Sequence, residues 1–147
     1  MRKVLNGFIG SLIGALLGAA VTASTFGWNH SLEHGSSFLG PTREWWPLVA
    51  MIFGVIGAVV GLVMGLVMVL TLPRLQIGLL AGVVVGLVAA LIMLSTTDPV
   101  YWQFRTEFER WVPPLLSLVG WGLVGEVMSL VAEKLASGRD ETPPLTN

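Results

Sequence analysis

The sequence predicts an all-α, polytopic membrane protein with four transmembrane helices, and three observations lead to this prediction. The 147 residues are 54% hydrophobic and only 12% charged, whereas soluble domains average about 25% charged residues. Four apolar runs are each long enough to cross a bilayer, which takes roughly 20 residues of α-helix. Glycines recur at every fourth position in three of these runs, so they share one face of each helix.

The predicted spans cover about residues 4–26, 46–72, 76–95 and 113–135. Residues 1–136 would form one transmembrane domain, and 137–147 a polar cytoplasmic tail. The first run is longer than the apolar part of a signal peptide, so we expect a retained helix. Only residues 73–75 separate the second run from the third, which predicts a tight helical hairpin. We expect the fourth span to begin at Pro113 and Pro114, since proline suits the first helical turn.

The two longer connections, 27–45 and 96–111, are rich in aromatic residues, which favour the headgroup region of a membrane. Residues 100–111 are expected to form a short interfacial helix. The basic residues near the spans divide five to three between the two sides: Arg2, Lys3, Arg74, Lys134 and Arg139 against Arg43, Arg105 and Arg110. This bias predicts cytoplasmic N- and C-termini, and we expect a prokaryotic plasma membrane.

The glycines at four-residue spacing predict contact faces of the GxxxG kind. A strip without side chains lets two helix backbones approach closely, which is a principal means of helix association in lipid. The three strips are Gly10, Gly14 and Gly18, then Gly57, Gly61 and Gly65, then Gly78, Gly82 and Gly86. A shift of 68 residues carries the first strip onto the third. This leaves open whether the chain consists of two tandem helical hairpins that arose by duplication.

Glu126 is the only ionisable residue well inside a predicted span, and an intramembrane carboxylate is a functional candidate by default. It is a candidate proton or cation site. The alternative is a structural role, such as a hydrogen bond to a backbone carbonyl or to Ser11, or a side chain that reaches toward the cytoplasmic interface or a partner subunit. Both interpretations stay open.

In size, glycine content and a carboxylate in the last helix, here Glu126, the chain resembles the four-helix proteolipids of rotary ATPases. It departs from that family in its long, aromatic connections and in the sparser glycine pattern of the first helix. We therefore interpret the resemblance as a similarity in size and composition and not as common descent.

Residues 30–34 match H-x-x-E-H, the inverted zinc-peptidase pattern, and on a helix His30 and His34 would share a face. The chain has no further histidine and no cysteine. We therefore favour a polar interfacial loop over a metallopeptidase and predict no metal site. Since no nucleophile–base set is present, we expect no catalytic residue. No cofactor is predicted, while bound lipid or pigment stays open.

Trp121 lies between Gly120 and Gly122, and we expect it to pack against small residues across a helix interface. The net charge of −1 gives nucleic-acid binding no electrostatic support. The sequence thus favours a non-enzymatic accessory or scaffold subunit that contacts the lipid bilayer. It would pack by its glycine faces against a membrane-protein partner or against itself, as a homo-oligomer. The alternative is a small proton- or cation-coupled transporter or channel that uses Glu126.

Overall fold

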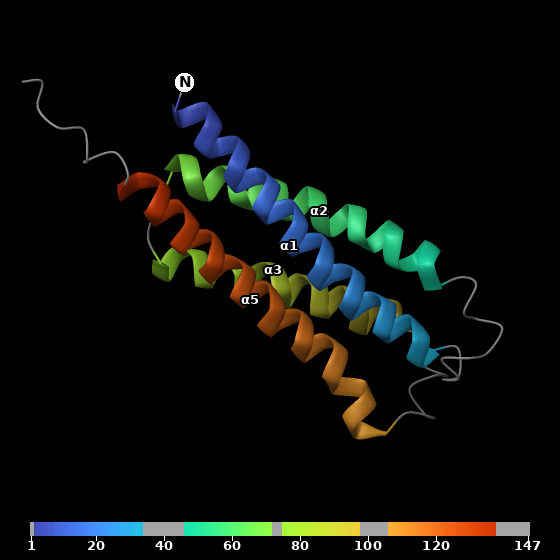
Figure 1. Ribbon diagram of the computed structural model, residues 1–147. Coiled ribbons are helices and arrows are strands. Elements are labelled where there is room, and N and C mark those ends of the chain that lie inside the picture. The colour runs from blue at the N-terminus through green and yellow to red at the C-terminus, as the bar shows by residue number, and fades with distance from the viewer. Residues whose placement is uncertain (1, 34–45, 72–74, 98–105, 138–147) are drawn as a thin grey trace, which may run out of the picture.

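The structure, a computed structural model, describes residues 2–33, 46–71, 75–97 and 106–137. These ranges contain four helices and no strand: α1 (Arg2–Glu33), α2 (Trp46–Thr71), α3 (Leu75–Thr96) and α5 (Glu107–Ser137) (Figure 1). All four are long and apolar enough to cross a membrane. The predicted fold class, all-α with four transmembrane helices, is confirmed.

The outward faces of all four helices carry large apolar side chains. Leu12, Val59, Leu80 and Leu123, one from each helix, are all more than half exposed. In a lipid environment such side chains need no covering, while the helix satisfies its own backbone hydrogen bonds. The surface of the bundle therefore suits direct contact with lipid.

The helices pack as two antiparallel hairpins. α1 lies against α2, and α3 lies against α5 (Figure 1). The two hairpins meet mainly where α5 contacts α1 and, to a lesser extent, α2. α2 and α3 make little contact, although only residues 72–74, which lie outside the described residues, separate them. The predicted short connection between them thus lies outside the described residues, and the two helices do not pack side by side as a hairpin would, because α2 packs mainly on α1 and α3 on α5.

The first helix is longer than its apolar run. It continues to Glu33, so the first part of the predicted 27–45 connection is helical. Beyond Phe26, α1 still has a buried face that includes Asn29. Contact with the rest of the bundle therefore extends the helix past the point at which hydropathy alone would end it.

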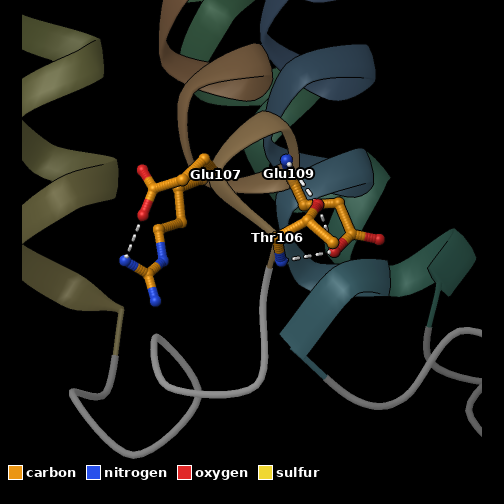
Figure 2. Close-up of polar contacts among 4 residues, drawn as sticks. Thr106, Glu107 and Glu109 are labelled. Carbon is orange, nitrogen blue, oxygen red and sulfur yellow. Dashed lines mark hydrogen bonds and ion pairs between the residues drawn. The ribbon is translucent and has the colours of Figure 1, made fainter.

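The last helix begins earlier than predicted. Thr106 precedes α5, its backbone N–H donates to Glu109 Oε2 at 3.0 Å, and the Glu109 N–H donates to Thr106 Oγ1 at 3.3 Å. This reciprocal arrangement is a capping box, and Figure 2 shows it beside the Arg110–Glu107 ion pair. Pro113 therefore lies inside the helix and not at its start. Residues 107–111 belong to α5, while 98–105 lie outside the described residues.

Candidate functional site

The glycine strips of α1 and α2 face each other across the middle of the first hairpin, formed by α1 and α2. The facing pairs are Gly10 with Gly65, Gly14 with Gly61, and Gly18 with Gly57. A Cβ placed on Gly14 would lie 2.9 Å from the carbonyl carbon of Gly61, and one on Gly61 would lie 2.7 Å from that of Gly14. Real Cβ atoms essentially never approach other atoms so closely, so the two backbones touch where these residues meet.

The third strip, on α3, faces α5. A Cβ on Gly78 would meet the carbonyl of Gly125, and one on Gly82 would meet the backbone of Trp121. Two of the facing residues on α5 are glycines: Gly125, and Gly122, whose Cα would lie 3.1 Å from a Cβ on Gly82. At Gly86 the other helix instead presents the backbone of Leu118.

All nine predicted glycines are buried and lie against helices of the same chain. The strips are therefore occupied within one copy of the protein. A partner could reach them only if the hairpins came apart. How much each glycine contributes to stability is a prediction taken up in the Discussion.

Trp121 lies where the two hairpins meet. It is 2% exposed, and its ring atom Cη2 lies 2.9 Å from the position of a Cβ on Gly18. Trp121 therefore packs against one small residue, Gly18, across the α1–α5 interface. Four further buried residues from α2 and α5 share its cluster: Met64, Met68, Val124 and Met128.

Two asparagines bond α1 to the second hairpin, one near each end of the bundle. Asn6 Nδ2 donates to the carbonyl of Leu135 at 3.2 Å, and Asn29 Nδ2 donates to Thr97 Oγ1 at 3.4 Å. We call the end that holds Asn6 and Leu135 the terminal end, and the end that holds Asn29 and Thr97 the opposite end.

Glu126 lies toward the terminal end of the bundle, near the level at which α3 begins. It follows Gly125, whose backbone meets Gly78, the fourth residue of α3. Glu126 is therefore about one helical turn from the start of α3. Its side chain is half-buried, and no hydrogen bond or ion pair of its carboxylate is found among the described residues. Ser11, an expected partner, instead donates to the carbonyl of Gly7 at 2.8 Å.

His30 lies in the last turns of α1, half-buried, and not in a loop. His34 lies outside the described residues. Within the described ranges, no three His, Asp or Glu side chains gather so that they could hold a metal ion.

The structure adds a set of buried polar residues that sequence reasoning did not single out: Thr22, Thr25, Asn29, Thr97, Ser117 and Ser129. Their signal was available on α1, because Thr22, Thr25 and Asn29 continue the face of Gly18 at helical spacing. All of them except Ser129, which lies against Gly78, lie between Trp121 and the opposite end.

Comparison of the chain with protein-family models, with curated proteins and with solved structures finds no match.

Proposed function

We propose that the protein is a small accessory or scaffold subunit of a membrane complex. The observation that carries the proposal is the closed interior at Trp121. Met64, Met68, Val124, Met128 and Trp121 are between 0 and 8% exposed and fill the space between α1, α2 and α5. A solute that crosses the membrane through the bundle would have to displace this cluster. The arrangement supports a packed, static role over a conducting one.

The described surface supports one particular mode of partner contact. Because the glycine strips lie against helices of the same chain, the surface left for a partner consists mainly of large aliphatic side chains. α3 is the helix with a single main packing neighbour, α5. Its exposed residues include Leu80, Val84, Leu87 and Leu91. We therefore propose that a partner helix, where one binds, packs on α3 through aliphatic side chains and not through glycines.

A non-enzymatic role is also proposed. Glu126 is the one carboxylate along the apolar part of the described helices, and two buried hydroxyls lie on the same helix, Ser117 and Ser129. Nine positions separate Ser117 from Glu126, which is about 14 Å at 1.5 Å per residue, and a hydroxyl nucleophile and its base must lie within hydrogen-bond reach. Ser129 is three positions from Glu126, but no hydrogen bond of the Glu126 carboxylate is found among the described residues, so neither pair supports nucleophilic catalysis.

The experiment that tests the scaffold proposal is mild extraction from native membranes followed by native mass spectrometry. We expect a larger membrane protein to co-purify with the chain. Val84→Trp, on the exposed face of α3, should reduce the co-purified partner, while Leu12→Trp, on the exposed face of α1, should not. Recovery of the natural protein only as a monomer or as a lone homo-oligomer would contradict the proposal.

The alternative is a small proton- or cation-coupled transporter or channel. It is favoured by one observation, the half-buried Glu126 carboxylate without a partner among the described residues. An intramembrane carboxylate often marks an ion or proton pathway. Flux through reconstituted vesicles distinguishes this alternative from the scaffold, as described in the Discussion.

A further inference from the structure

Two buried hydroxyl groups have no hydrogen-bond partner within the described part of the chain: Thr22 Oγ1 and Ser117 Oγ. Thr22 is 5% exposed and Ser117 is 0% exposed. Buried hydroxyls in folded proteins nearly always bond to protein or to ordered water. Two such groups in one small bundle therefore call for a physical explanation.

Both hydroxyls lie in the same layer of the bundle. α1 and α5 run antiparallel, with Gly18 against the Trp121 ring and Val21 against Gly120. Thr22 is one turn after Gly18, and Ser117 is one turn before Trp121. Because the helices are antiparallel, both steps lead away from Trp121 toward the opposite end. Thr22 and Ser117 thus lie at about the same level on the two facing helices, each one turn beyond the Gly18–Trp121 contact.

Further buried polar side chains continue from this layer to the opposite end. Thr25 and Asn29 follow Thr22 along the buried face of α1, and Asn29 bonds to Thr97 after the end of α3. Toward the terminal end, the next buried side chains are the ring of Trp121 and the methionines of its cluster. Thr22, Thr25, Asn29, Thr97 and Ser117 therefore form a column that stops at Trp121, and the buried Ser129 lies beyond Trp121, outside the column.

We propose that this column binds water, and that one water molecule bridges Thr22 Oγ1 and Ser117 Oγ. Each hydroxyl can both donate and accept, as water can, and a buried water needs two to four polar partners. The five residues of the column are themselves uncharged, so their chemistry fits a neutral ligand better than an ion. The water would join α1 of the first hairpin to α5 of the second beside the Trp121 contact.

Hydroxyl-radical labelling of the protein in lipid nanodiscs tests this proposal, because radicals formed from internal water oxidise the side chains beside it. Met93 and Met128 form a matched pair, at 1% and 0% exposed. Met93 lies one turn before Thr97, whose hydroxyl bonds to the Met93 carbonyl, whereas Met128 lies in the methionine cluster beyond Trp121. We expect Met93 to be oxidised several-fold faster than Met128. Equally slow oxidation of both would overturn the proposal.

Removal of the two hydroxyls gives a second test. The double variant Thr22→Val, Ser117→Ala should lower the oxidation rate of Trp121, whose ring lies one turn from both hydroxyls. Ser11→Ala, outside the column, should leave it unchanged. Each single variant should lower the Tm, since the bridging water loses a partner. An unchanged Trp121 rate in the double variant, or a raised Tm in both single variants, would show that the hydroxyls are dry and would overturn the proposal.

Discussion

Gly14 and Gly61 present their backbones to each other so closely that each carbonyl group lies where the side chain of the other residue would begin. This mutual contact is the midpoint of three such pairs along the first hairpin. Apolar side chains gain little free energy when they move from lipid into a helix interface. Close backbone packing is therefore a main source of helix association in a membrane. The first hairpin should therefore be sensitive to any side chain at these positions.

Gly14→Leu or Gly61→Leu should force α1 and α2 apart. Overpacking of a well-packed interior typically costs about 1–3 kcal/mol, and we expect the upper end because backbone atoms must move. Thermal unfolding in detergent or bicelles measures the effect. Leu12→Ile, on the exposed face of α1, is the control and should leave the Tm unchanged. Equal tolerance of all three changes would refute the contact role of these glycines.

The structure also separates glycines that tolerate a methyl group from glycines that do not. A Cβ on Gly54 would meet Ala23 Cβ at 3.6 Å, an ordinary contact, whereas one on Gly57 would meet the carbonyl of Gly18 and the side chain of Thr22. We expect Gly54→Ala to be neutral or to stabilise by about 0.4–1 kcal/mol. Gly57→Ala should destabilise.

The second hairpin allows the same comparison. Gly122→Ala should be tolerated, because its Cβ would lie 3.5 Å from Val83, and Gly125→Ala should not, because its Cβ would meet the carbonyl of Gly78. Thermal unfolding of the four alanine variants checks the ranking. A lower Tm for Gly54→Ala than for Gly57→Ala would contradict the described register of α1 on α2.

The Asn29–Thr97 hydrogen bond should contribute modestly to stability. Side-chain hydrogen bonds between transmembrane helices average about 0.6 kcal/mol in double-mutant cycles, and this bond is long at 3.4 Å. We expect a coupling energy of that order between Asn29→Ala and Thr97→Val. Unfolding free energies of the two single variants and the double variant give the coupling. Strictly additive effects would mean that the bond does not form.

Glu126→Gln should preserve folding and assembly if the carboxyl has only a structural role, since the amide has a similar shape and keeps a hydrogen-bond donor. We expect this outcome. Proton and cation flux through reconstituted vesicles, measured beside the Tm, checks it. Flux with the natural protein that disappears in a well-folded Glu126→Gln variant would favour the transporter over the scaffold.

The basic-residue bias predicts that both termini are cytoplasmic. Because the natural chain contains no cysteine, single cysteines at Ser36, Arg74 and Ser137 can be labelled without background. A membrane-impermeant maleimide should label Ser36→Cys in intact cells, and should label the other two only after permeabilisation. Labelling of Arg74→Cys but not of Ser36→Cys would reverse the orientation.

Some misplaced boundaries could have been read from local patterns. The T-x-x-E pattern at Thr106 and Glu109 is a capping box and marks the start of α5. Pro113 and Pro114 directed the prediction to the wrong turn, because they lie inside α5, and transmembrane helices tolerate proline beyond the first turn. The polar continuation of the α1 face at Thr22, Thr25 and Asn29 likewise indicated that the helix does not end near Phe26.

The sequence by itself determined the fold class, the four spans and the face of each helix on which the glycines lie. Apolar run length and helical periodicity are local properties, so they need no knowledge of neighbours. Only the tertiary structure decided which helices pair, since α3 packs on α5 and not on α2. It also decided that Glu126 lies near the start of α3, and that Thr22 and Ser117 lie one turn beyond the Gly18–Trp121 contact. These relationships join residues far apart in the chain, and they depend on which backbones can approach each other most closely.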